Sequence, residues 1–200
     1  MLSSTFLDEA GSAGKCELPS GELTSLRPSN LWIGLKNSDD QGTQFDVRTQ
    51  LFINSSLVTE GETRCITGVT RNPNQAKEVT VAFGSLLGGN LASGDVLSVK
   101  VLTRIGTNPD DTKCAGPGGS HSNAIGLRLY YDATLQASHF GAKIAPDPLR
   151  DFFLHSNGTT FFLNATPPTA TAAKFKDSPA VKFAGGNPWK EIGTWSMALP

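Results

Sequence analysis

The chain has 200 residues, of which 38% are hydrophobic and 18% are charged, a composition typical of one folded domain. Its 17 basic and 18 acidic residues give a formal net charge of -1, so no field of one sign would attract a polyanion and we expect no nucleic-acid partner. No segment reaches the roughly 20 consecutive apolar residues that a membrane helix needs, so we expect no insertion into a membrane.

The first eight residues contain neither the basic nor the apolar region of a secretion signal. The chain is then either cytoplasmic or the mature part of an exported protein. Because its composition, rich in Ser, Thr, Asn and Gly, is typical of secreted β modules, we expect an extracellular or cell-surface location.

Four segments alternate apolar and polar residues with a period of two, which is the pattern of half-buried strands. Their apolar positions are Phe45, Val47, Leu51 and Ile53; Val79, Val81 and Phe83; Leu97, Val99 and Val101; and Ile125, Leu127, Leu129 and Tyr131. Asp46, Arg48 and Tyr130 fall on the opposite parity and are expected to face water.

Shorter apolar runs lie between turn residues and are further candidate strands. They span 31–35, 65–69, 140–144, 152–155, 160–163, 181–183 and 194–199. About eleven strands predict an all-β fold, a two-sheet antiparallel sandwich of the jelly-roll or Ig-like kind with very little helix. Only residues 147–157 and 187–191 could begin a helix. We expect residues 1–200 to form a single domain, with residues 1–30 as an N-terminal extension or an edge strand.

The three cysteines leave one unpaired in any pairing, and none forms the close pairs that zinc sites use. A disulfide between Cys65 and Cys114 is one interpretation. Three buried thiols are the other, and the spacing of the cysteines does not distinguish the two.

A calcium site is the one cofactor that the sequence suggests. Asn37, Asp39, Gln41 and Gly42 follow the spacing of a calcium loop, but Arg48 occupies the position that requires a bidentate glutamate, so the segment is not an EF-hand. Asp39, Asp40 and Asp46 could form a looser calcium site. The alternative is an ordinary turn with no cofactor.

Candidate ligand-binding residues come from loops and from outward strand positions. The longest segment without a strand pattern, Gly106–Asn123, contains His121, and long loops of this kind often carry binding sites. Trp189 lies in a turn that could display its ring to a sugar. On the outward parity of one strand, Arg128, Tyr130 and Asp132 could line a binding surface.

Three segments resemble uncharacterised β-sandwich domains of secreted or surface-attached bacterial proteins. They are Leu31–Asp40, Gly126–Tyr131 and Lys190–Trp195, and the likeness covers residues 31–199. The resemblance implies a location and a class, a non-catalytic extracellular module, and it supplies no catalytic residue.

Three functions follow as hypotheses. The first is a module that binds a polysaccharide or another cell-surface ligand. The second is a structural or adhesive surface protein that self-associates through its sheet edges. The third, a polysaccharide-active hydrolase, would need carboxylates such as Asp147, Asp151 and Asp177 to lie close together.

Overall fold

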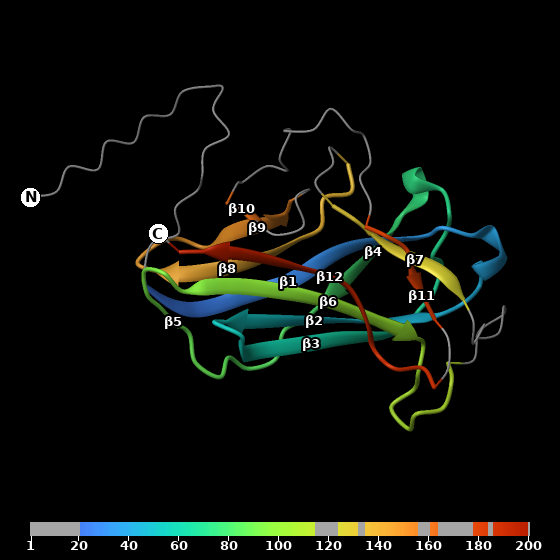
Figure 1. The fold of residues 1–200 in the computed structure, drawn as a ribbon, viewed down its shortest axis with the longest axis horizontal. Coiled ribbons are helices and arrows are strands. Elements are labelled where there is room, and N and C mark those ends of the chain that lie inside the picture. Colours follow the sequence, from blue (N-terminus) through green and yellow to red (C-terminus); the bar gives the residue numbers. More distant parts are fainter. Residues whose placement is uncertain are drawn as a thin grey trace, which may run out of the picture.

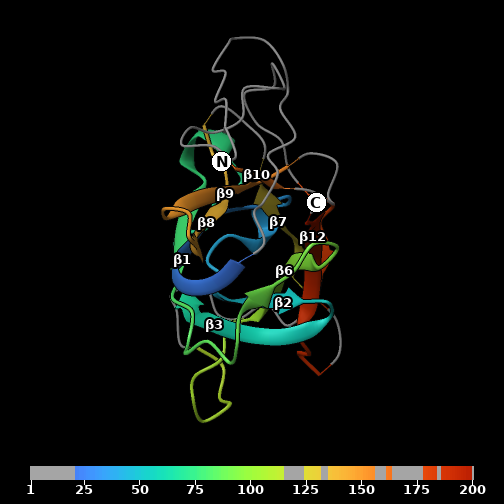
Figure 2. The ribbon, with the colours of Figure 1, turned by 90° about the vertical axis from the view of Figure 1, so that its left-hand side faces the viewer.

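The fold is an all-β sandwich of two antiparallel sheets, as predicted from the period-two patterns. The computed structural model describes residues 21–114, 124–131, 135–155, 161–163, 178–183 and 186–199. The strands run along the long axis of the molecule (Figure 1), and a view from the end shows them surrounding a common interior (Figure 2).

The smaller sheet has four strands in the order β12-β6-β2-β3. Their bounds are Lys190–Ala198 for β12, Val96–Ile105 for β6, Phe45–Ile53 for β2 and Ser56–Ile66 for β3. Both neighbours of β2 pair with it along its length, so β2 lies inside the sheet with β6 on one side and β3 on the other.

The larger sheet is built around β1 (Gly21–Leu35), which pairs with four other strands. Its main order is β10-β9-β8-β1-β7-β11, with β4 and β5 also paired to β1. The bounds are Lys77–Val81 for β4, Asn90–Leu91 for β5, Ile125–Tyr130 for β7, His139–Ala145 for β8, Arg150–Leu154 for β9, Phe161–Leu163 for β10 and Val181–Lys182 for β11. Two short 3-10 helices, η1 (Ser38–Asp40) and η2 (Pro73–Gln75), complete the described part, in which no helix is long and apolar enough to cross a membrane.

The core lies between the two sheets and is filled by the predicted apolar parity of each strand. On β2 and β6 these side chains are buried while most of their sequence neighbours reach solvent, which is the signature of one covered face. The larger sheet contributes Ile33, Leu127 and Leu129, all buried. Aromatic pairs join the layers, as where the ring of Phe45 on β2 lies 5.6 Å from that of Phe183.

Neither segment that could have begun a helix forms one in its described residues, so that prediction was wrong. Residues 150–154 form β9, which pairs with β8, and the ring of Phe152 stacks on Phe140 at 5.0 Å. Burial of this apolar run outweighs the local helix signal. At residues 187–191, the Asn187 side chain bonds to Ile105 of β6, and Lys190 begins β12.

Candidate ligand-binding face

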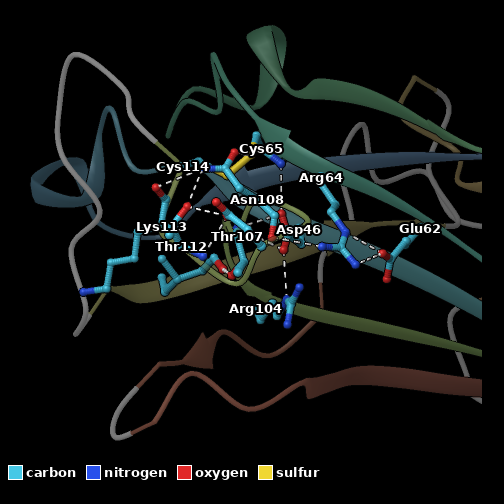
Figure 3. The surroundings of a disulfide bond; sticks show 12 residues. Asp46, Glu62, Arg64, Cys65, Arg104, Thr107, Asn108, Thr112, Lys113 and Cys114 are labelled. Carbon is cyan, nitrogen blue, oxygen red and sulfur yellow. Dashed lines mark hydrogen bonds and ion pairs between the residues drawn. A yellow bond between two sulfur atoms is a disulfide. The ribbon is translucent and has the colours of Figure 1, made fainter.

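Asp46 is fully buried, although its position on β2 predicted a side chain facing water. Its Oδ1 accepts hydrogen bonds from the backbone N–H of Cys65 at 2.9 Å and of Thr107 at 3.2 Å. Its Oδ2 accepts from Arg104 Nε at 2.9 Å, and Thr107 N also lies 3.1 Å from it (Figure 3). The carboxylate is therefore the polar centre of this end of the sheet, and its burial is possible because every oxygen has a donor.

The predicted calcium set does not come together. Asn37 caps η1 by accepting from Asp39 N at 3.2 Å, and its own amide donates to the exposed Asp39 carboxylate, so this segment is a locally bonded turn. In the described part of the chain, three ligand-type side chains meet within 4.8 Å only at Asp46, Cys65 and Cys114. Those two sulfurs are bonded to each other, which removes them as thiolate ligands.

The disulfide between Cys65 and Cys114 is present, with the two Cα atoms 5.7 Å apart. It ties β3 to the segment after β6, where Thr107 pairs with Lys113 and Cys114 N donates to Gly106 O at 3.0 Å (Figure 3). The first part of the long loop that we expected to be structureless is thus a small, covalently anchored hairpin. The rest of that loop, with His121, lies outside the described residues.

Trp189 is half-buried on the outer face of the four-stranded sheet, where two arginines contact its ring. Arg48 Cζ lies 4.3 Å from the ring centroid and Arg104 Cζ lies 4.6 Å from it. Cation–π contact of this kind holds the indole against the guanidinium groups. We call Trp189, Arg48, Arg104, Glu62 and Arg64 the Trp189 face.

Asn187 explains why the Trp189 ring lies beside Arg104. Its Oδ1 accepts from Ile105 N at 2.8 Å, and its Nδ2 donates to Ile105 O and to Thr107 Oγ1, both at 3.0 Å. Asn187 has φ 53°, a left-handed conformation that Asn adopts more readily than most residues. The turn is therefore pinned to the end of β6, one residue beyond Arg104.

Two of the three arginines of the face, Arg48 and Arg64, are held by Glu62 on β3. Arg48 is its cross-strand partner and donates from Nε at 3.2 Å and Nη2 at 2.7 Å to Oε2. Arg64 donates to Oε1 and, from Nη1, to the backbone oxygen of Asn108 at 3.1 Å. Burial alone would raise the pKa of Glu62, but the hydrogen bonds and charges of the two arginines outweigh it and lower that pKa.

Of the other predicted ligand residues, Tyr130 is corrected and two lie outside the described residues. Tyr130 is only 1% exposed, so the expected display of its ring was wrong. Its ring lies against Gly34, where an added Cβ would come within 2.6 Å of Tyr130 Cε2. Arg128 is half-buried, with Cζ 5.6 Å from the Tyr130 ring centroid. Asp132, like His121, is not among the described residues.

Two of the three carboxylates considered for hydrolysis are engaged in ion pairs. Asp147 lies 3.5 Å from Arg150, and Asp151 lies 3.9 Å from Arg27. Asp177 falls outside the described residues.

The sequence interpretation identified Trp189 but missed the arginines that contact it. Arg48 and Arg104 occupy outward positions of two alternating strands, and this was the available signal. The sequence does not reveal the register between β2 and β6, which makes Asp46 and Arg104 cross-strand partners. No family model, no curated protein and no solved structure matches the chain.

Proposed function

We propose that this chain is a non-catalytic extracellular module that binds a polysaccharide or another cell-surface ligand through the Trp189 face. The observation that carries the proposal is the half-buried indole on an outer sheet face, with the guanidinium groups of Arg48 and Arg104 over its ring. A flat ring can cover the apolar face of a pyranose, while neighbouring polar groups orient its hydroxyls.

Two features suit such a module. The strands that carry Arg48, Glu62 and Arg104 are paired on a rigid sheet, so binding would require little ordering of the protein. The Cys65–Cys114 disulfide supports an extracellular location, because disulfides persist in oxidising compartments and are rare in the cytosol.

Affinity electrophoresis against a panel of immobilised polysaccharides tests the proposal. We expect at least one polysaccharide to retard the wild-type chain and Trp189→Ala to abolish the retardation. Trp32→Ala is the matched control, because Trp32 is a half-buried tryptophan on β1 of the opposite sheet. Circular dichroism would verify that both variants fold. If no polysaccharide retards the wild type, or if both substitutions act alike, the proposal is wrong.

Self-association through a sheet edge is a second candidate, favoured by β12. Within the described residues no backbone hydrogen bond reaches the side of β12 that faces away from β6. The other edge of this sheet is covered, because Leu87 N donates to Val58 O and Gly84 N donates to Glu60 O. Light scattering over a wide concentration range tests the idea, and a monomer throughout would contradict it.

A further inference from the structure

The Trp189 face has hydrogen-bond donors to spare but few acceptors. All four carboxylate oxygens of Asp46 and Glu62 accept hydrogen bonds from protein groups. Arg104 donates only from Nε, and its two terminal amino groups make no hydrogen bond within the described part of the chain. Arg48 likewise donates from Nε and Nη2 to Glu62, while its Nη1 has only Glu60 at 4.0 Å.

The donors left over lie beside the indole, because they belong to the two arginines whose Cζ atoms are 4.3 and 4.6 Å from its centroid. A ligand group that only accepts hydrogen bonds, and that carries negative charge, fits these donors best. Paired guanidinium N–H groups match the two oxygens of a carboxylate or a sulfate, whereas a neutral hydroxyl offers one uncharged oxygen and forms weaker hydrogen bonds.

We propose that the Trp189 face selects acidic polysaccharides, whose sugar ring lies on Trp189 while a carboxylate or sulfate group accepts from Arg104 and Arg48. This inference rests on the proposed function and adds the chemical class of the ligand. Glu62 on this face and the buried Asp46 beneath Arg104 pair with its arginines, so the formal charge of the group is close to balanced. Selection comes from short-range hydrogen bonds rather than from attraction at a distance.

Matched polysaccharides separate the acidic group from the sugar ring. Polygalacturonate and its fully methyl-esterified form share a ring and differ in charge, and dextran sulfate and dextran form the corresponding pair for sulfate. By isothermal titration calorimetry we expect the charged member of at least one pair to bind about tenfold or more tightly than its neutral partner. The pair that shows the difference identifies the acidic group as carboxylate or sulfate.

Variants then test the role of Arg104. Arg104→Lys keeps a cation that can pair with Asp46 but removes the two terminal amino groups, so we expect the preference for the charged polymer to fall about tenfold. Arg27→Lys is the control, because Arg27 is an exposed arginine on β1 of the opposite sheet and lies outside the Trp189 face. It should leave the preference within about twofold of wild type.

The outcomes distinguish the two proposals. Equal affinity for the charged and neutral members of both pairs overturns the acidic selectivity and leaves the binding function standing. A preference that survives Arg104→Lys unchanged, in a variant with wild-type thermal stability, also overturns it. Absence of binding to every polysaccharide overturns both proposals.

Discussion

Asp46 on β2 and Arg104 on β6 are direct cross-strand partners, joined by a bond of 2.9 Å between Oδ2 and Nε. Asp46 is 0% exposed and the Arg104 side chain is 13% exposed, so the pair spans the boundary between interior and surface. The inner end holds the disulfide-anchored hairpin through Cys65 and Thr107. The outer end lies against Trp189. One ion pair thus couples the stability of this end of the sheet to the geometry of the candidate site.

Asp46→Ala should lower the free energy of unfolding by about 3–5 kcal/mol, because it leaves the largely buried Arg104 without its anion and removes an acceptor from two backbone N–H groups. Urea unfolding followed by fluorescence measures the change. Asp39→Ala, at an exposed position in η1, should stay within about 0.5 kcal/mol of wild type. Comparable losses in the two variants would show that the Asp46 network contributes little.

Removal of the disulfide should lower the free energy of unfolding by about 4 kcal/mol in the chain-entropy model. The reason is that the disulfide joins two cysteines 49 residues apart in the sequence and so restricts the unfolded chain. The double substitution Cys65→Ser and Cys114→Ser, compared with wild type in urea, measures this loss. Before that, a thiol titration of the unfolded, unreduced chain should find one reactive thiol among the three cysteines. Three thiols would contradict the bridge.

Most of the fold could be predicted from local pattern. Each of the four alternating segments contains a strand, and most of their apolar positions lie in the core, because period-two alternation directly reports which face is covered. Residues 21–30, expected as an extension or an edge strand, form the first part of β1 and pair with both β8 and β5. Of β3, only the last two residues fell in a predicted strand. Both segments are largely polar, as in Gly21–Asn30, and their strand conformation depends on pairing with distant partners such as β8.

The candidate site was only partly predictable, for a related reason. Trp189 stood out by residue type and turn context, but the neighbours that give it a role come from β2, β3 and β6. Asp46 and Tyr130 were misplaced because parity assigns a side chain to a face without saying whether that face is open. A hairpin covers Asp46, and Tyr130 fits over the space left by Gly34.

Tyr130 should therefore act on stability and not on ligand binding. Tyr130→Ala is expected to lower the free energy of unfolding by about 3–5 kcal/mol, the usual cost of truncating a buried aromatic side chain. Trp189→Ala, at a half-buried position, should cost less. Chemical unfolding of both variants provides the comparison, and a larger loss for Trp189 would contradict the assignment.

Gly34 should be intolerant of any side chain, because a Cβ there would lie 2.6 Å from the Tyr130 ring. We expect Gly34→Ala to cost about 1–3 kcal/mol through overpacking. The penalty should shrink when Tyr130→Ala is also present, and a double-mutant cycle measures this coupling. Strictly additive effects would mean that the close approach to Tyr130 is not what restricts Gly34.

Glu62 should make stability depend on acid pH. Its two arginines hold the pKa of the folded carboxyl below the ordinary value of 4.5, despite the opposing effect of burial. A carboxyl whose folded pKa is lowered stabilises the fold fully above its unfolded pKa and loses that contribution as pH falls through the folded pKa. The difference in unfolding free energy between wild type and Glu62→Gln should thus be largest near neutral pH and shrink below pH 4.5.

The arginines supply the control for this titration. In a chain that carries Arg48→Gln and Arg64→Gln, the hydrogen bonds and charges that lower the Glu62 pKa are absent, while burial, which raises that pKa, remains. The loss of stability caused by adding Glu62→Gln should then no longer be largest near neutral pH. Urea unfolding at a series of pH values from about 3 to about 7 measures both comparisons. This range extends to both sides of the ordinary carboxyl pKa. An undiminished effect of Glu62→Gln in the double-arginine variant would assign the pH dependence to another partner of that carboxylate.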